Sequence, residues 1–493
     1  MKKLLVWLIP VLFLSLQTTA QLNTWSKRVY IEISEEQGTM MNDFPVRMVI
    51  NTQTPIGTGD MDSNGDDIRF TSDSCGYNLL PYWIESGINT DSTVIFVKAD
   101  FVGANASDSI FMFYGSAGAA PMSNIDSVFS SYWISGGVDT TLYGIQMIQY
   151  FQLDAGDTLT LQADTALLLN AYYTNINGFV YGKGKGYPAS TVSGTYANGE
   201  GPGAGAFNTS EASSGGGYGG QGGEGGDDTP PGVAGGVAYG TNNTDTIQMG
   251  SSGGSADNGL GGNGGGSFSI RGIYSSISGI ISVEGDTSAA LDGSRGGGGG
   301  AGGGFLVNAD VIVFSGSVNA DGGIGGYGGS SANDGGGGGA GGRIKMFYND
   351  TLFDSGSTSV LGGQGGGISS SSAPGSNGAD GTVYTGITGG NVKYNLVVNA
   401  AIDNPGCSSV SLNEYEQNTW AIYPNPTRND ITIELLSNTN NSTIEIFDFS
   451  GRMIISETLY TTSVYSLGEY GSGIYLIKIS DNTHVENFKV IVE

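Results

Sequence analysis

The density of glycine in one long segment restricts the folding of this chain more than any other feature of the sequence. Positions 201–390 contain 63 of the 87 glycines in the 493-residue chain, about one residue in three. Collagen is excluded, because a triple helix needs glycine at every third position together with abundant proline. A linker would be flexible and featureless, whereas here strand-like apolar segments interrupt the glycine runs at regular intervals. We therefore expect much of this segment to fold.

The apolar segments recur with a period that indicates a repeat protein. Phe268, Phe305, Ile344 and Val383 occupy the same place in successive copies, 37, 39 and 39 residues apart. One copy has too little apolar surface to fold alone, so neighbouring copies must share a core. Residues 171–400 are therefore predicted to form a glycine-rich parallel β-helix or a related β-solenoid.

The glycine runs themselves leave two possibilities open. They either pack as extended, polyglycine-like strands or hang on the solenoid as disordered loops. The segment 199–265 lacks clear strands, and we expect it to be a disordered insertion. Matches to G-x-G-x-x-G in this region do not indicate a nucleotide site, because the composition generates them by chance.

Alternation of apolar and polar residues characterises the N-terminal part of the chain. Residues 29–33 and 109–115 alternate in this way, as half-buried strands do, and turn-forming residues lie between such segments. Because no helical period is sustained, residues 25–129 are predicted to form a β-sandwich. Residues 130–170 contain further strand-like runs and are expected to be a strand-rich bridge to the repeats.

The same N-terminal region carries three short motifs. They are Trp25-x-x-Arg28, Asp67-Ile68-Arg69-Phe70 and Leu80-Pro81-Tyr82-Trp83-x-Glu85. In these motifs residues 25–129 resemble a bacterial domain of unknown function that recurs in large secreted and surface proteins. The resemblance implies location and architecture, and it brings no established activity.

The C-terminal segment contains a second ordered set of motifs. They are Tyr423-Pro424-Asn425-Pro426, the turn Ser450-Gly451-Arg452, and the strand Gly473-Ile474-Tyr475-Leu476. Residues 421–493 thereby resemble the type A C-terminal sorting domain of the Bacteroidota type IX secretion system. The resemblance implies an Ig-like β-sandwich that the type IX machinery recognises, and a product that is released or fixed at the cell surface. Residues 401–420 are expected to be the linker to this domain.

The N-terminus is typical of an exported protein. Two lysines precede an apolar run from Leu4 to Leu16, and small residues end at Ala20. This pattern predicts a signal peptide over residues 1–20, too short to serve as a membrane span. No later segment reaches the length of about eighteen apolar residues, so we expect no transmembrane segment in the mature chain.

Charge and rare residues narrow the possible functions. The chain has 46 Asp and Glu residues against 18 Lys and Arg residues, a formal net charge of −28. Such a surface repels phosphate backbones, so nucleic acid is not an expected partner. The single histidine, His484, lies in the sorting segment, which removes most histidine-based catalysis from the rest of the chain. Whether Cys75 and Cys407 pair is left open by the sequence.

One local motif suggests a metal ion. Asp60, Asp62, Asn64 and Asp66 place oxygen ligands at alternating positions, as a calcium loop requires. The twelfth position is Thr71 where a bidentate glutamate is expected, and no flanking helices are visible. The alternative is an ordinary turn of Asp, Asn and Gly leading into the next strand. Calcium is the only cofactor that the sequence suggests.

Aromatic residues beside a carboxylate suggest a ligand site. Trp25, Tyr82 and Trp83 are candidates for a glycan-binding platform, and Glu85 is a candidate for contact with a sugar. Packing of the aromatic rings in the core and pairing of Glu85 with an arginine are the competing interpretations. A second carboxylate at catalytic distance cannot be named, so no catalytic residue is identified.

These observations predict an all-β, secreted or surface-attached protein without enzymatic activity. Its expected role is adhesive or structural, with stacked repeats forming a stalk that presents the N-terminal sandwich to extracellular glycans or other surfaces. The alternative is a polysaccharide-binding or polysaccharide-degrading enzyme on a solenoid scaffold. The scarcity of basic residues in the repeats argues against a lyase. A third possibility is a matrix component whose glycine segments self-associate.

Overall fold

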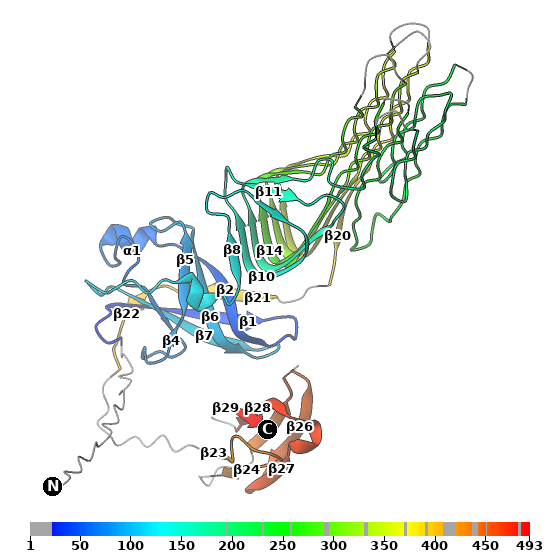
Figure 1. Ribbon diagram of the computed structural model, residues 1–493. Helices are drawn as coiled ribbons and strands as arrows, with labels where there is room; N and C mark the ends of the chain where they lie inside the picture. The colour runs from blue at the N-terminus through cyan, green and yellow to red at the C-terminus, as the bar shows by residue number, and fades with distance from the viewer. Residues whose placement is uncertain are drawn as a thin grey trace, which may run out of the picture. The chain divides into compact units, whose positions relative to one another are not determined.

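The computed structural model describes residues 22–192, 196–228, 231–256, 259–289, 295–329, 334–368, 372–389, 393–407, 420–435, 442–449, 451–481 and 485–493. The predicted signal peptide at 1–20, residues 408–419 of the predicted linker, and His484 lie outside these residues. Contacts divide the chain into one unit of Met1–Val128 with Tyr394–Glu493 and another of Phe129–Lys393 (Figure 1). None of the described helices has the length and apolar character needed to cross a bilayer.

The all-β prediction is confirmed, and the N-terminal sandwich consists of two antiparallel sheets. One has the order β21–β1–β7–β3–β4, with β22 also paired to β1, and the other has the order β2–β6–β5. The elements are β1 (Lys27–Glu35), β2 (Met41–Ile50), α1 (Gln53–Thr58), β3 (Arg69–Thr71), β4 (Leu79–Leu80), β5 (Tyr82–Ser86), β6 (Thr93–Val102), β7 (Ser107–Tyr114), α2 (Ile125–Val128), β21 (Tyr394–Val398) and β22 (Ile402–Asp403). Val29, Ile31 and Ile33 alternate into the core, as the two-residue period of a strand requires.

Two strands of the sandwich come from the sequence after the repeats. β21 pairs with β1 from Ile31 opposite Val398, and β22 pairs with β1 from Arg28 opposite Ile402. Residues 401–407 therefore belong to the sandwich, and the predicted linker is wrong for this part. The reason is that β1 would otherwise leave one edge without ladder hydrogen bonds. The repeat unit is thus an insertion between Val128 and Tyr394.

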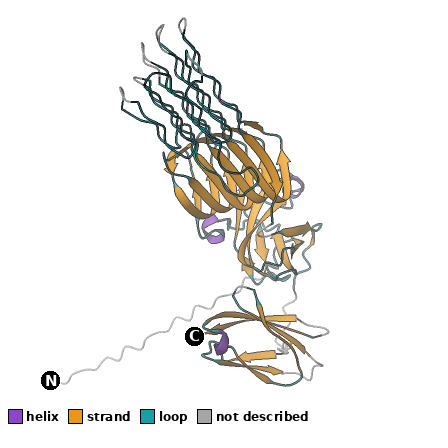
Figure 2. Cartoon of the chain, turned by 90° about the vertical axis from the view of Figure 1, so that its right-hand side faces the viewer, coloured by secondary structure: helices purple, strands orange, loops and turns teal. Residues whose placement is uncertain are grey.

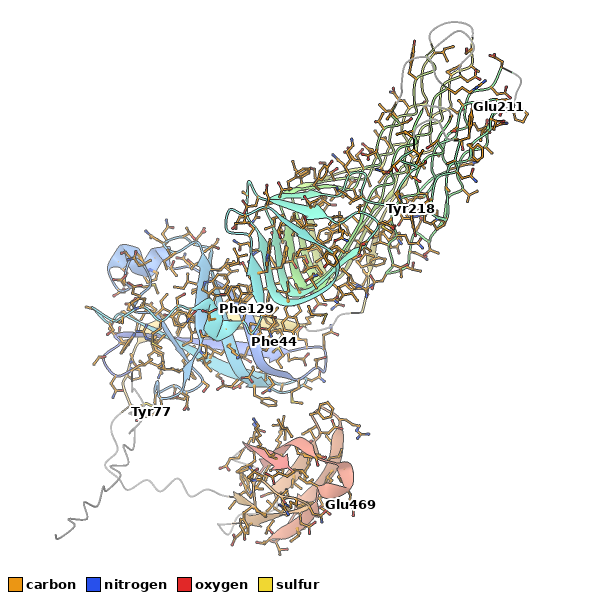
Figure 3. All side chains as sticks on the ribbon, in the orientation of Figure 1. Phe44, Tyr77, Phe129, Glu211, Tyr218 and Glu469 are labelled. Carbon is orange, nitrogen blue, oxygen red and sulfur yellow. A yellow bond between two sulfur atoms is a disulfide. The ribbon has the colours of Figure 1, made fainter. Side chains whose placement is uncertain are left out.

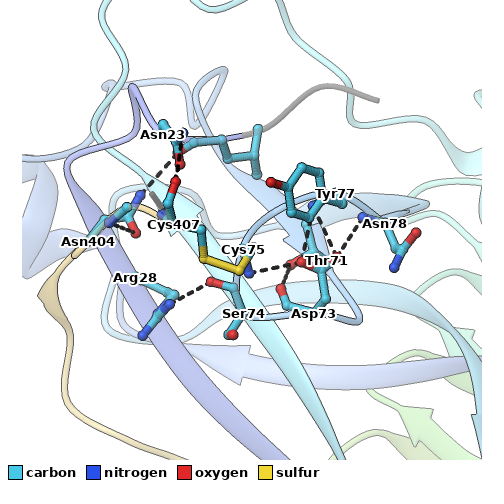
Figure 4. Close-up of a disulfide and its surroundings, with 12 residues drawn as sticks. Asn23, Arg28, Thr71, Asp73, Ser74, Cys75, Tyr77, Asn78, Asn404 and Cys407 are labelled. Carbon is cyan, nitrogen blue, oxygen red and sulfur yellow. Dashed lines mark hydrogen bonds between the residues drawn. A yellow bond between two sulfur atoms is a disulfide. The ribbon is translucent and has the colours of Figure 1, made fainter. Parts of the chain in front are cut away.

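A disulfide secures this return of the chain. Cys75 and Cys407, separated by 332 positions, are bonded, which answers the question that the sequence left open (Figure 4). The side chain of Asn23 accepts the backbone N–H of Cys407 at 3.1 Å and donates to its carbonyl oxygen at 3.3 Å. The disulfide and these two hydrogen bonds therefore hold the chain around Cys407 against the sandwich.

The repeat region forms the predicted parallel β-solenoid. Its sheets have the orders β20–β18–β16–β14–β12–β10–β8 and β19–β17–β15–β13–β11–β9, and every pairing is parallel. The strands are β8 (Tyr132–Ile134), β9 (Thr140–Leu142), β10 (Gly144–Leu153), β11 (Thr158–Leu161), β12 (Leu167–Ile176), β13 (Phe179–Tyr181), β14 (Ser267–Ile277), β15 (Ile280–Ser282), β16 (Gly304–Phe314), β17 (Ser317–Asn319), β18 (Arg343–Asp354), β19 (Ser357–Ser359) and β20 (Thr382–Ile387). Phe268, Phe305, Ile344 and Val383 lie in register on neighbouring strands, so one repeat is one coil.

The solenoid begins earlier than predicted. Strands within residues 130–170, which were expected to form a separate bridge, pair in the same ladders as the later coils. Phe151 and Leu161 from these strands share one buried cluster with Phe268 and Phe305. The bridge interpretation is wrong because the first coils lack glycine runs but contribute inward residues to the same core.

Beyond the strands, the glycine-rich runs extend from the sheets as a bundle of elongated chains (teal in Figure 2). Along residues 298–303 the backbone N–H groups donate in turn to three different neighbours, the runs 251–254, 337–340 and 283–286, and the cycle then repeats. A cycle of three residues is the period of a polyproline II helix. The bundle is therefore a lattice of threefold helices joined by backbone hydrogen bonds. Of the two possibilities left open by the sequence, the packed, polyglycine-like strands are confirmed for the described residues.

The predicted disordered insertion at 199–265 is wrong for its described residues, because its glycine runs belong to this lattice and its residues 241–246 bond to β18. Gly215 donates its N–H to Gly223 at 2.9 Å, and Gly217 donates to Gly203 at 2.8 Å. A Cβ atom on Gly215 or Gly217 would lie within 3.0 Å of a backbone oxygen of another run. Low apolar content does not imply disorder here, because backbone hydrogen bonds between closely packed chains replace side-chain packing.

The C-terminal domain has two further sheets, with the orders β23–β24–β27 and β26–β25–β28–β29. Its elements are β23 (Trp420–Tyr423), β24 (Asp430–Leu435), β25 (Ser442–Phe447), β26 (Met453–Leu459), β27 (Ser463–Ser466), the 3₁₀ helix η1 (Gly468–Tyr470), β28 (Gly473–Ser480) and β29 (Val485–Val492). Trp420, Ile446 and Ile477 are among the buried residues that the two sheets share. The domain is thus a β-structure with its own core.

Candidate functional site

The predicted calcium loop is folded by its own hydrogen bonds. The carboxylate of Asp62 accepts the N–H of Asn64 at 2.9 Å, and that of Asp60 accepts the hydroxyl of Thr58 at 2.8 Å. In the part of the chain that the structure describes, no three His, Cys, Asp or Glu side chains are grouped as a metal site requires. The loop therefore does not gather Asp60, Asp62 and Asp66 around one point, and calcium binding stays a prediction.

The residue that organises this loop is Asp67, which was not among the predicted ligands. Its buried carboxylate accepts the N–H of Asp62 at 3.1 Å and the N–H of Gly115 at 2.7 Å. Its backbone carbonyl accepts the indole N–H of Trp25 at 2.6 Å. Gly115 has φ +86° and no room for a Cβ beside Ser26, so only glycine fits here. Asp67 thus fastens the loop to the end of β7.

The two aromatic residues of β5 do not form a common platform. Tyr82 is buried, and its hydroxyl donates to the carbonyl oxygen of Ile68 at 2.7 Å. Trp83 follows it on the strand and so points to the opposite face, where its ring stacks on Phe96 with centroids 5.8 Å apart. Tyr82 is therefore not accessible to a ligand. Of the predicted ligand residues on this strand, Trp83 and Glu85 are half-buried and retain access to solvent.

Trp25, the remaining predicted ligand residue, belongs to a structural cluster. The guanidinium of Arg69 lies 5.5 Å from the centre of its indole ring. Arg69 is buried and donates to the carbonyl oxygens of Asp66 at 2.9 Å and Ala120 at 2.6 Å. The motif residues Trp25, Asp67 and Arg69 therefore hold the sandwich together. A ligand role for Trp25, Trp83 and Glu85 stays a prediction, and the structure does not bring them into one site with Tyr82.

A cluster that the sequence did not reveal lies on the outer face of the larger solenoid sheet. Residues 239–246, which we call the strap, cover the start of β18. The ammonium group of Lys345 donates to three strap carbonyls, those of Thr241 at 2.5 Å, Thr244 at 3.1 Å and Thr246 at 2.6 Å. The side chain is almost fully enclosed, with 1% exposure. Lys345 therefore fastens the strap to the sheet.

Arg343, two residues earlier on the same face of β18, acts in the same way. Its guanidinium donates to the carbonyl of Tyr239 at 2.8 Å and also bonds the side chain of Asn242. It lies 5.5 Å from the ring centre of Tyr218, which is labelled in Figure 3. Arg271 on β14 adds an ion pair with Asp245 of the strap at 3.1 Å. Three of the few basic residues in the repeats, Arg271, Arg343 and Lys345, therefore all bind the strap.

Burial perturbs the titration of these groups. It lowers the pKa of Lys345 to about 8, with Arg343 lowering it further and Asp245 opposing the shift. Burial also lowers the pKa of Arg343 and raises the pKa values of Tyr218 and Tyr239. Lysine and tyrosine with shifted pKa values are residue types that serve as acids and bases in active sites. Here Lys345 and Arg343 donate to carbonyl oxygens of the strap. The hydroxyl of Tyr239 donates to the carbonyl of Met249, and that of Tyr218 accepts the N–H of Gln248. The arrangement therefore clamps a segment instead of opening a site.

The motifs of the C-terminal domain have direct structural roles. The amide of Asn425, in the P-N-P motif, donates to the carbonyl of Lys489 at 2.6 Å and accepts the N–H of Ile491 at 3.0 Å. It therefore pairs with the edge of β29 as a strand would. Arg452, in the S-G-R turn, forms an ion pair with Asp448 at 3.0 Å. The hydroxyl of Tyr475, in the G-I-Y-L strand, donates to a carbonyl oxygen four residues earlier at 2.7 Å.

Comparison with known families finds two matches, one in the N-terminal part of the chain and one at the C-terminal domain. Residues 421–493 match a secretion system C-terminal sorting domain, and residues 64–136 match a domain of unknown function, DUF2341. The second match includes Asp67, Arg69 and Tyr82 and does not include β1 or β2. No curated protein matches the chain. Both resemblances are confirmed, and the sorting tail marks the protein for export by type IX secretion to the cell surface or the extracellular space.

Proposed function

We propose that this exported protein is a non-enzymatic adhesive or structural component of the cell surface or its surroundings. The observation that carries the proposal is the glycine lattice. Residues 296–303 and 335–342 are completely buried and consist only of glycine and alanine. An interior of this kind holds no side chains with which to build a catalytic centre, whereas its dense backbone hydrogen bonding suits a stiff element.

The use of basic residues supports the same proposal. A polysaccharide lyase needs cationic or other acid–base side chains exposed along one face. In the solenoid, Arg343 and Lys345 are enclosed by the strap, and Arg271 is paired with Asp245. The degrading enzyme therefore remains the weaker alternative.

The insertion changes the arrangement that was predicted for an adhesin. The repeat unit leaves the sandwich after Val128 and returns at Tyr394, so it does not separate the sandwich from the sorting domain along the chain. A stalk that carries the sandwich does not fit this connectivity. We propose instead that the inserted unit is the part that meets the extracellular partner, while the sandwich connects it to the sorting tail.

Glycan binding is the form of adhesion that a specific observation favours. Several large aromatic residues of the inserted unit are exposed, among them Tyr143, Tyr172 and Tyr327. Tyr327 is 47% exposed, and its ring lies beside Gly367. Exposed tyrosine rings offer an apolar face and a polar edge, the combination that sugar rings use for stacking.

The test is a polysaccharide pull-down and glycan-array screen of the full chain, with and without calcium, assayed in parallel for released sugar. We expect binding without sugar release, and weaker binding for Y172A and Y327A. Y470A, which removes an exposed tyrosine of the sorting domain, is the matched control and should bind like the wild type. Release of sugar would contradict the proposal. Calcium dependence would support the predicted loop at 60–67.

A further inference from the structure

The last strand of the solenoid ends in an open edge. β20 pairs with β18 through residues 382–387 opposite 343–348, and it is the terminal strand of its sheet. Among the described strands none pairs with its other side. The N–H and C=O groups along that side are therefore available to a further strand.

The side chains of β20 also show that the last coil is incomplete. Phe268, Phe305 and Ile344 form a fully buried row through the solenoid, and Val383 continues this row. Val383 is nevertheless 48% exposed, and Ile387, on the same face, is 75% exposed. The opposite sheet ends one coil earlier, at β19. The inward face of β20 thus lacks the cover that every preceding coil receives from the next one.

The chemistry of the edge is unusual for this protein. β20 reads Thr-Val-Tyr-Thr-Gly-Ile, without a charge or a proline, in a chain whose formal net charge is −28. Monomeric proteins normally protect edge strands with charged residues, proline or bulges, and the terminal repeats of solenoids normally carry a polar cap. An uncharged edge is also a place where two strongly acidic molecules can approach without direct repulsion.

We infer that a second copy of this chain covers β20, through antiparallel pairing of the two β20 strands about a twofold axis. Directly opposed residues of an antiparallel pair point to the same face, so a register centred on a residue, and not between two residues, keeps both inward faces on the same side. Centring on Thr385 sets Val383 of each copy opposite Ile387 of the other. The exposed apolar residues Val383 and Ile387 are therefore symmetric about Thr385, as self-pairing requires.

This pairing continues the interface that already joins one coil to the next. The seven-stranded sheet of one copy runs into that of the other, and the two exposed apolar residues of each edge become mutually covered. Because the same surface is used by both copies, the assembly closes at two and does not polymerise. The inference is independent of the proposed glycan binding, since it uses neither the exposed tyrosines nor a ligand.

The decisive test is a cysteine at the centre of the proposed pairing. The only two cysteines, Cys75 and Cys407, are bonded to each other, so T385C in the full chain introduces a single thiol. Directly opposed Cβ atoms in an antiparallel pair are about 4.5–5.5 Å apart, and mild oxidation should link the T385C dimer rapidly. The control is I280C, which replaces an exposed residue on β15 and should remain unlinked.

Sedimentation equilibrium supplies a second, independent readout. We expect the wild type to reach twice the monomer mass at micromolar concentration, I387K to be monomeric, and V237K, at another exposed apolar position, to dimerise normally. Circular dichroism and the melting temperature verify that each variant is folded. A wild type that stays monomeric, an I387K variant that dimerises equally well, or open-ended polymers would each overturn the inference. So would T385C that links no faster than I280C.

Discussion

At the scale of single residues, two buried hydroxyl groups interrupt the apolar core of the solenoid. Thr174 on β12 and Ser275 on β14 are paired neighbours, and both are fully buried. Neither hydroxyl has a hydrogen-bond partner among the described atoms. In the flanking strands the corresponding positions are Phe151 and Ile312, both of which are apolar. A buried hydroxyl without a partner reduces the free energy of unfolding.

Replacing Thr174 with valine should therefore stabilise the protein. Valine has nearly the same shape and carries no polar atom, so we expect the free energy of unfolding to rise by about 1 kcal/mol. Chemical denaturation of wild type and T174V measures the difference. T191V, at an exposed threonine, is the control and should change stability little. A loss of stability in T174V would show that the hydroxyl has a partner after all.

Lys345 gives the second prediction at this scale, a dependence of stability on pH. Its pKa falls from 10.5 to about 8 in the folded protein because the ammonium group is buried. Between these values the unfolded chain holds a proton that the folded protein has lost, so stability rises with pH across this window. The stability gap between wild type and K345M should widen from pH 8 to pH 10.5, measured by denaturation at a series of pH values.

Hydrogen exchange supplies the control for that experiment. K345M leaves the three strap carbonyls without their donor, so amides in residues 241–246 should exchange faster than in the wild type. K183M removes an amino group that is paired with Glu284 outside the strap and should leave strap exchange unchanged. A gap that narrows as pH rises would contradict the assigned direction of the pKa shift.

At the scale of structural elements, the glycine runs pack so closely that backbone hydrogen bonds join them directly. The absence of side chains at these contacts is what stabilises the bundle. Gly338 donates its N–H to Ser376 at 2.9 Å, and a Cβ atom at this position would lie within 3.0 Å of a backbone oxygen of the run that contains Gly363. A methyl group therefore cannot enter without separating two runs. The same close approach recurs at other glycines of the described runs, such as Gly215, Gly299 and Gly363.

G338A tests this property directly. We expect the free energy of unfolding of the inserted unit to fall by about 1–3 kcal/mol, the cost of overpacking a dense interior. G389A is the matched control, because a Cβ atom at Gly389 meets nothing within 4 Å and should be tolerated. Thermal unfolding followed by circular dichroism compares the two variants. Equal melting temperatures would mean that the lattice accommodates side chains and is not closely packed.

At the scale of the whole molecule, the chain closes on itself around the inserted unit. β21 and β22 complete the sandwich after 265 residues of solenoid and bundle, Phe129–Lys393, and the disulfide lies just beyond them. The two ends of the insertion are therefore fixed to one domain. The sandwich is therefore completed by strands from both sides of the insertion.

Removing the disulfide should weaken that closure selectively. In C75S/C407S we expect the sandwich to lose about 2–4 kcal/mol, a typical value for a disulfide that closes a long loop. Hydrogen exchange should accelerate in residues 394–403, where the returning strands pair with β1. Reducing agent should reproduce the effect in the wild type and do nothing to the variant. Unchanged exchange in these strands would show that the ladder bonds alone secure them.

The sequence by itself determined the all-β class, the repeat period and the sorting tail. These depend on local signals: alternation in single strands, the spacing of Phe268, Phe305, Ile344 and Val383, and motifs that occupy consecutive positions. The family resemblances were recognisable for the same reason, because the residues of each motif lie at fixed, closely spaced positions in the sequence.

Only the tertiary structure decided how distant segments meet. The pairing of β21 with β1, the bond between Cys75 and Cys407, and the strap over Lys345 each join residues that lie about a hundred positions or more apart. The order of segment 199–265 was hidden too, because a glycine lattice is held by backbone groups that every sequence possesses. What selects the lattice is the lack of side chains at the contacts, and that becomes evident only when neighbouring runs are in place.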